Sequence, residues 1–170
     1  MKNPFKNKVF RRWFWIILIA LVLLLRIPTR LSVATVNWNS DYPIDLLEKE
    51  PDFYEFRKES GFGMTLYVRE DDNGTVTYEV SAWPDTLFGS RQTRCIECTD
   101  PDYKICGISV GDDMDTAAQI MLRQGFRQGR HDFQFSRLGV VVTFYKDQET
   151  NMINEIVVSV PSTMILPVVF

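Results

Sequence analysis

The three cysteines are the residues whose type and spacing could most readily do chemistry. Cys95, Cys98 and Cys106 lie within twelve residues of one another. A Cys-x-x-Cys pair is typical of redox sites when its setting stabilises the thiolate. Here Glu97 lies between the first two cysteines, and a nearby carboxylate raises a thiol pKa. For a domain outside the cytoplasm we therefore rank a structural disulfide first, then free thiols, a metal site and redox catalysis.

Other motifs for metal binding or catalysis are missing from the sequence. A zinc site would need a fourth ligand, but the single histidine, His131, follows Cys106 by 25 residues, which is atypical of zinc sites. The acidic runs at 71–72 and 112–115 lack the alternating oxygen ligands of a calcium loop. There is no nucleophile elbow, phosphate loop or HExxH motif. We therefore predict a non-catalytic protein with no catalytic residue, metal ligand or cofactor.

A continuous apolar run near the start predicts contact with a membrane. Residues 13–25 are thirteen apolar residues, preceded by five Lys or Arg and followed by Arg26 and Arg30. The length suits a signal peptide and is short for a membrane-spanning helix, which needs about 20 residues. Ser32-Val33-Ala34 is the best small-x-small cleavage site, but positive charge precedes it. We favour an uncleaved transmembrane signal anchor, and cleavage near Ala34 is the alternative.

The charge distribution predicts which side of the membrane the rest of the chain occupies. Residues 1–30 hold seven of the 19 Lys and Arg and none of the 22 Asp and Glu, so residues 31–170 carry a net charge of −10. The positive-inside rule then places the N-terminus in the cytoplasm and the domain outside, as a single-pass plasma-membrane protein. A domain so acidic is repelled by nucleic acid, which we exclude as a partner.

Hydrophobic patterns predict the elements of the remaining chain. After a linker at 31–40, residues 42–60 are expected to form two short helices, divided at Pro51, and this helical segment is expected to end at Gly61. Alternating residues at 64–68 and 76–82 around Asn73-Gly74 predict a hairpin, and residues 103–110 predict a strand. Apolar residues spaced three and four apart predict a helix from Met114 that ends at Gly125-Phe126. A second hairpin is expected at 140–144 and 156–160, whereas 85–103 appears less regular.

These elements give an α+β fold class with a possible internal repeat. We expect an N-terminal membrane helix at 1–30, then one domain of antiparallel β-hairpins at 41–170 with helices packed on one sheet face. The segments 41–84 and 104–161 each read as a helix followed by a hairpin, so two tandem helix-hairpin repeats are one arrangement of this domain.

The second of these segments resembles a known module. The stretch Gly107-Ile-Ser-Val-Gly-Asp-Asp, the helix that ends at Gly125-Phe126 and the closing hairpin are similar to the repeat unit of β-lactamase inhibitor proteins and small outer-membrane assembly lipoproteins. The resemblance covers about residues 105–160. It implies protein–protein contact outside the cytoplasm without catalysis. No cysteine comes directly after the apolar run at 13–25, where a lipidation cysteine would lie, so lipidation is not predicted.

Taken together, the sequence predicts a membrane-anchored extracytoplasmic domain that binds a protein or cell-envelope partner. Its contacts would be the membrane, through residues 13–25, and an unidentified protein. Aromatic side chains supply contact area, and the candidate binding surface comprises Tyr67, Tyr78, Trp83 and Tyr145. A redox- or metal-responsive envelope protein acting through Cys95, Cys98 and Cys106 is the alternative, and a protein secreted after cleavage near Ala34 is a second.

Overall fold

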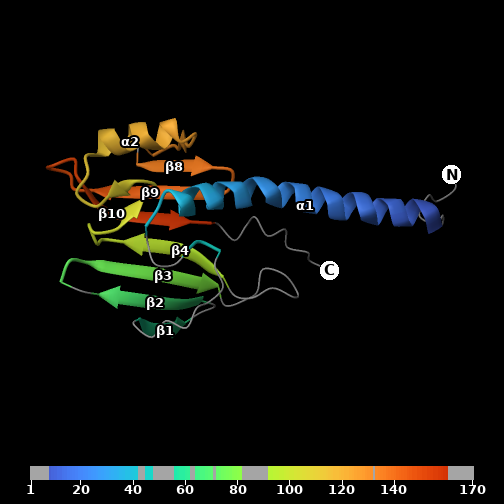
Figure 1. Ribbon diagram of the computed structural model, residues 1–170, viewed down its shortest axis with the longest axis horizontal. Helices are drawn as coiled ribbons and strands as arrows, with labels where there is room; N and C mark the ends of the chain where they lie inside the picture. Colours follow the sequence, from blue (N-terminus) through green and yellow to red (C-terminus); the bar gives the residue numbers. More distant parts are fainter. Residues whose placement is uncertain are drawn as a thin grey trace.

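A single antiparallel sheet organises the chain. The computed structural model describes residues 8–41, 45–47, 56–61, 64–70, 72–81, 92–131 and 133–160. Its main sheet has eight strands in the order β1-β2-β3-β4-β10-β9-β8-β7 (Figure 1). The strands are β1 Arg57–Gly61, β2 Met64–Glu70, β3 Thr75–Ser81, β4 Thr93–Cys98, β7 Arg127–Gln128, β8 Gln134–Arg137, β9 Val140–Lys146 and β10 Ile153–Ser159.

The two expected hairpins are present as β2–β3 and β9–β10. Tyr67 pairs with Tyr78 in the first hairpin, and Val142 pairs with Val158 in the second. In the first turn, a side chain at Gly74 would lie 2.7 Å from the Asp100 backbone, so only glycine fits there. This close approach ties the turn to the segment that follows β4.

Strand β4 joins the two hairpins, although its sequence appeared irregular. It pairs with β3 on one side and with β10 on the other, so it lies in the middle of the sheet. Ile96 and Cys98 are buried, while the charged Glu97 between them is exposed. Alternation of apolar and charged residues is the pattern of a strand with one buried face. In β4 this pattern covers too few residues to be recognised from the sequence.

Two helices are seen in the described part of the chain, and they differ in how much of their length is packed. Helix α1 is Lys8–Trp38, and helix α2 is Met114–Arg123. The Asp113 carboxylate caps α2 by accepting a hydrogen bond from the Thr116 N–H at 2.9 Å. Gly125, with φ +81°, ends it as predicted, and the Phe126 N–H donates to the Met121 carbonyl at 3.1 Å.

The C-terminal part of α1 is fixed to a short hairpin beside α2. Val33 and Val36 are buried in the core. Asp41, just after the helix, exchanges two hydrogen bonds with the backbone of Lys104, in the hairpin β5 Lys104–Ile105 and β6 Ile108–Ser109. The N-terminal part of α1 extends away from the sheet (Figure 1). The expected single strand at 103–110 is therefore a hairpin, and the expected linker at 31–40 is mainly helix.

The structure corrects the prediction of a transmembrane signal anchor. Among the residues that it describes, no helix has the length and the sustained apolar character that a membrane crossing requires. Helix α1 is long, but the uninterrupted apolar run within it covers only residues 13–25, followed by Arg26, Pro28 and Arg30. Thirteen residues fall short of the roughly 20 that span a bilayer. Cleavage near Ala34, which was the alternative, would cut α1 between Val33 and Val36, the residues that pack it into the core.

The structure also corrects the predicted fold for the segment 41–84, which was expected to be a helix followed by a hairpin. Residues 57–60 were expected to be helical, but they form the edge strand β1, which pairs with β2. The rest of that expected helix lies partly outside the described residues, and 46–47 form a turn. A tandem helix-hairpin repeat is therefore wrong as a description. The chain instead builds one continuous eight-stranded sheet, in which pairing with β2 outweighs the helix propensity of Arg57, Lys58 and Glu59.

Candidate functional site

The two faces of the main sheet differ in chemistry because successive side chains of a strand point to opposite faces. We call the face packed against the helices the core face. Its fully buried side chains include Tyr78, Ile96, Val142, Phe144 and Ile156. We call the opposite face the outer face. It presents residues that alternate with the core set, namely Leu66, Val68, Thr77, Glu79, Cys95, Glu97, Val141, Thr143, Tyr145, Glu155, Val157 and Ser159.

Three carboxylates lie across the centre of the outer face. Glu97 on β4 is exposed. In the register of the sheet, Glu79 of β3 lies opposite Cys95, which is two residues before Glu97. On the other side of β4, Val157 of β10 lies opposite Glu97, and Glu155 is two residues before Val157. Glu79 and Glu155 are therefore the diagonal neighbours of Glu97 on its two sides. Burial raises the pKa of Glu79 and of Glu155, and the negative charge of Glu97 raises both further. Arg94 partly opposes the rise in the pKa of Glu79. This part of the sheet is therefore an acidic surface.

The three cysteines occupy separate environments as free thiols. Cys95 lies on the outer face and Cys98 on the core face, because they are three residues apart in one strand. Side chains on opposite faces of a strand do not meet the geometry of a disulfide. Cys106 is buried in the β5–β6 turn, where its N–H donates to the Ser40 hydroxyl at 2.9 Å.

Burial keeps these thiols protonated. It is the largest cause that raises the pKa of Cys95 to about 12, that of Cys98 to about 11 and that of Cys106 to about 12. The carboxylates of Glu97 and Glu79 raise the pKa of Cys95 further. The thiolate is both the nucleophile and the metal ligand. Across the described ranges no three His, Cys, Asp or Glu side chains are grouped to hold a metal ion.

The four aromatic residues chosen from the sequence are not on one surface. Tyr67 is 5% exposed and Tyr78 is fully buried, so both belong to the core. Trp83 lies outside the described residues. Tyr145 is 47% exposed and pairs across the strands with Glu155. Sequence reasoning chose these tyrosines for their size, and only the strand register shows which face each one occupies.

Tyr145 belongs instead to a stack of three rings. Its ring lies 6.2 Å from that of Phe133, with an interplanar angle of 28°. Phe133 in turn stacks on His131 at 5.3 Å and 15°. This stack could not be predicted from the sequence, because Phe133 and Tyr145 come from different segments, which the β8–β9 pairing brings together. The alternation of 140–145 could have indicated that Tyr145 faces outward.

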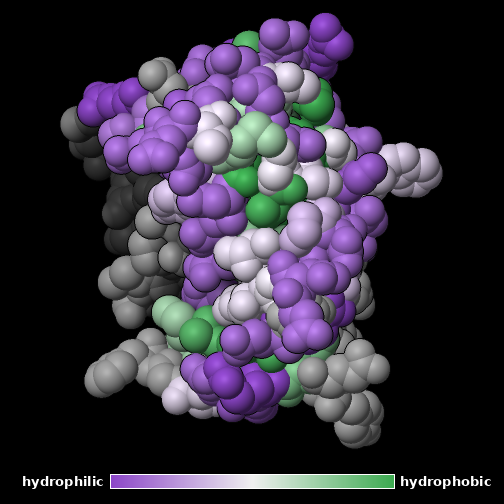
Figure 2. Space-filling model, turned by 90° about the vertical axis from the view of Figure 1, so that its left-hand side faces the viewer, coloured by the Kyte–Doolittle hydropathy of each residue, from purple (hydrophilic) through white to green (hydrophobic). Residues whose placement is uncertain are grey.

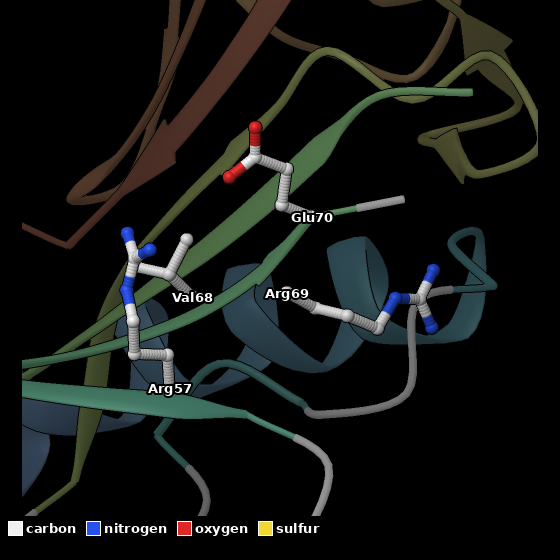
Figure 3. A pocket seen from close by; sticks show the side chains of 4 residues that line it. All are labelled: Arg57, Val68, Arg69 and Glu70. Atoms are coloured by element: carbon white, nitrogen blue, oxygen red, sulfur yellow. The ribbon is translucent and has the colours of Figure 1, made fainter. Parts of the chain in front are cut away.

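A cavity of about 310 Å³ lies at the β1–β2 end of the sheet and is lined by Arg57, Val68, Arg69 and Glu70 (Figure 3). Arg57 and Val68 are cross-strand partners on the outer face, and Glu70 follows two residues later. Figure 3 shows Arg69 pointing the other way. Its guanidinium lies 3.4 Å from the Asp100 carboxylate and 4.9 Å from the centre of the Tyr103 ring. Sequence reasoning missed this cavity because it expected a helix at Arg57.

Comparisons with known proteins add little to this geometry. No family model and no curated protein matches the chain. A solved structure, of an extracellular protein containing an SCP domain from Bacillus anthracis str. Ames, is similar with a TM-score of 0.46 and 11% sequence identity. The match covers 63% of this chain and 39% of that one, so this chain spans about two fifths of that protein's length. At this level of similarity we transfer nothing from that protein.

Proposed function

We propose that the protein is a non-catalytic binding domain held at a lipid bilayer. The observation that carries this proposal is the exposed N-terminal part of α1. Seven large apolar side chains are exposed there, from 36% for Leu18 to 63% for Ile17; they are Trp13, Phe14, Trp15, Ile16, Ile17, Leu18 and Leu21. Exposed apolar patches of this kind mark sites of contact with membranes or proteins. Attachment to lipid does not require that α1 cross the bilayer. It requires only that these exposed side chains enter the apolar part of the bilayer.

The difference in hydrophobicity between the two ends of the molecule supports attachment to lipid through α1. Arg12 and Arg30 are exposed on α1 on either side of the apolar segment, where they can meet lipid headgroups. The end of the molecule opposite the N-terminus of α1 is mainly hydrophilic, with smaller hydrophobic patches near its centre and along its lower part (Figure 2). One end therefore suits lipid and the other suits water.

The outer face of the sheet is the surface that we propose for the partner. The acidic row of Glu79, Glu97 and Glu155 would attract a basic protein surface and repel an acidic one. Tyr145, beside Glu155, adds an exposed aromatic ring of the type enriched at interfaces. The resemblance of residues 105–160 to a repeat unit used for protein contact supports the same proposal.

The location outside the cytoplasm is part of the proposal and rests on the resemblance of residues 105–160 to a repeat unit that is used outside the cytoplasm. Protease added to intact cells and to lysed cells tests it. We expect digestion of the sheet domain in intact cells once the outer layers of the envelope are permeabilised. Protection until the plasma membrane is broken would place the domain in the cytoplasm.

Flotation with lipid vesicles tests attachment to the bilayer. Full-length protein should float with vesicles of phosphatidylcholine and phosphatidylglycerol. Replacement of Phe14, Trp15 and Leu18 by serine should abolish flotation because it removes three exposed apolar side chains from the segment. The control is Leu122→Ser on α2, which removes an exposed leucine elsewhere and should float normally. Equal flotation of the native and triple-serine proteins would refute the proposal.

Site-specific photocrosslinking in membranes tests the binding face. A benzoylphenylalanine at position 145 should give a discrete adduct with a second protein. The same probe at exposed Leu122, on α2, is the matched control and should give none. Glu97→Lys should reduce the adduct at position 145 several-fold because it reverses the central charge. No adduct at 145, or the same adduct at both positions, would contradict the assignment.

A further inference from the structure

Positive and negative charge are separated along this chain. Residues 1–30 hold seven Lys and Arg and no Asp or Glu, whereas residues 31–170 carry a net charge of −10. Five of the seven basic residues precede the apolar run at 13–25, and two follow it. The net charge of −3 for the whole chain is therefore the sum of a positive N-terminal segment and an acidic domain.

The structure places this positive charge next to exposed apolar side chains on one helix. Arg12 is exposed and comes directly before Trp13, which is 60% exposed. Residues 13–18 are all exposed, and six consecutive residues make more than one full turn, so α1 presents apolar surface on every side here. Arg30 is exposed beyond the other end of the apolar run. A matching partner must therefore surround the helix with apolar groups and present anionic groups at the ends of the run.

A bilayer that contains negatively charged phospholipid meets both requirements. Acyl chains can surround a helix completely, whereas a groove on a protein surface covers one face of a helix. The apolar stems of Lys and Arg allow their charged ends to remain at the level of the headgroups. Binding of a helix to a bilayer increases with its buried apolar area and with its electrostatic attraction to anionic lipid.

We propose that α1 selects bilayers that contain anionic phospholipid, through the basic residues on both sides of its apolar run. The inference rests on the proposed attachment to lipid and adds the class of lipid. Each Lys or Arg close to an anionic surface strengthens binding about fivefold. Helix α1 has no acidic residue in its first turn, so the positive end of the helix dipole adds to the attraction.

The acidic sheet domain restricts this attraction to α1. A surface with excess negative charge is repelled by anionic headgroups, and Glu79, Glu97 and Glu155 add to the repulsion on the outer face. The repulsion acts within about 10 Å of the bilayer, which is the Debye length at about 0.1 M salt. The outer face should therefore remain in water, where it is accessible to the protein partner that we propose for it.

Flotation of the full-length protein with two kinds of vesicle tests the class of lipid. At about 0.1 M salt, binding to phosphatidylcholine with phosphatidylglycerol should be at least about tenfold stronger than binding to phosphatidylcholine alone. Salt at about 1 M should remove most of this difference, because it shortens the Debye length to about 3 Å. Equal binding to both vesicles would overturn the inference and leave attachment to lipid intact. Binding to neither would contradict attachment to lipid as well.

A matched pair of charge variants tests which residues select the lipid. Lys8→Gln, Arg11→Gln and Arg12→Gln together should reduce the preference for anionic vesicles on the order of tenfold. Binding to phosphatidylcholine should not change, because the apolar run is intact. The control has the same net charge and lacks three exposed basic residues of the sheet domain, through Arg123→Gln, Arg127→Gln and Arg130→Gln. The control should keep the native preference. A preference that survives in the α1 variant, or an equal loss in both variants, would overturn the inference.

A soluble polyanion separates recognition of lipid from recognition of an acidic protein. Polyglutamate carries negative charge without acyl chains, so it should not release the protein from anionic vesicles at an equal concentration of charge. Release by polyglutamate would show that negative charge alone is sufficient for binding. That result would overturn the inference and favour an acidic protein as the partner of α1.

Discussion

The core face and the outer face of the sheet are built from the same strands, yet they differ in burial and charge. On β3, β4 and β10 the core face carries Tyr78, Ile96 and Ile156, all fully buried. One residue along each strand, the outer face carries Glu79, Glu97 or Glu155. Apolar burial stabilises the fold, whereas grouped carboxylates repel one another. The carboxylates of the outer face therefore lower the stability of the fold, and the binding role that we propose for this face would account for their presence.

The largest expected effect compares two adjacent residues of β9. Phe144 is fully buried and packs edge-on against Phe135 with ring centres 5.7 Å apart, whereas Tyr145 is 47% exposed. Phe144→Ala should lower the free energy of unfolding by about 3–5 kcal/mol because it leaves a cavity. Tyr145→Ala should lower it by about 1 kcal/mol, mainly through the lost stack with Phe133. Urea denaturation measures both, and equal losses would erase the distinction between the faces.

Cysteine alkylation compares the faces chemically. At pH 8 all three thiols should react with iodoacetamide on the order of tenfold or more slowly in the native protein than in urea, because burial raises their pKa. Glu97→Gln should speed the reaction of Cys95, whose pKa Glu97 raises, and leave Cys98 unchanged. Peptide mass spectrometry measures each site. Equal acceleration at Cys98 would mean that Glu97 acts on the fold and not on one face.

A partly buried and an exposed ion pair allow a third comparison, of how much each contributes to stability. Arg69 extends from β2 on the core side to Asp100, whose side chain is 2% exposed, while Arg57 pairs with Glu59 at the exposed edge. Arg69→Leu should lower the free energy of unfolding by about 1–3 kcal/mol, because it leaves a buried carboxylate without its cation. Arg57→Leu should change it by less than about 0.5 kcal/mol. Thermal and urea denaturation of both variants measure the two changes in stability. A larger loss for Arg57→Leu than for Arg69→Leu would contradict the prediction that the buried ion pair contributes more.

The smallest expected effect is a dependence of stability on pH. The pKa values of Glu79 and Glu155 are raised in the folded state, so the folded chain binds protons more readily than the unfolded chain. Their contribution to stability is fully present below their ordinary pKa of 4.5 and is lost as pH rises through the raised values. Stability should therefore increase from pH 7 towards 4.5. Glu97→Gln should flatten this slope in part, because burial is the larger cause of both raised pKa values and Glu97 the smaller. An unchanged slope would show that Glu97 does not contribute to it.

Local patterns predicted the local elements of the fold. The alternation around Asn73-Gly74 and in 140–160, and the helix from Met114 to Gly125, follow from periods of two and 3.6 residues that any short window shows. Strand β1 and strand β4 could not be predicted in this way. The sequence of β1 is polar, and that of β4 is short, so each becomes a strand only because a neighbouring strand supplies its hydrogen bonds.

The candidate site was less predictable than the fold. Glu79, Glu97 and Glu155 come from three strands and lie together only through the register of β3, β4 and β10. Tyr67 and Tyr78 seemed suitable for contact, yet a shift of one residue in register decides whether a tyrosine is buried or exposed. The close spacing of Cys95 and Cys98 suggested a pair, and their three-residue separation within a strand places them on opposite faces.

The central position of β4 has a consequence for how the chain folds. Its partner β10 ends at Ser159, about sixty residues after β4, so the middle of the sheet is completed only after the whole of this intervening stretch has been synthesised. The β2–β3 hairpin can form early, but β4 then presents one unpaired edge to the surroundings until β10 arrives. Contacts so distant in sequence slow folding. A ribosome-bound chain that ends before residue 153 therefore leaves one edge of a central strand without its hydrogen-bonding partner, and such an edge can pair with another chain.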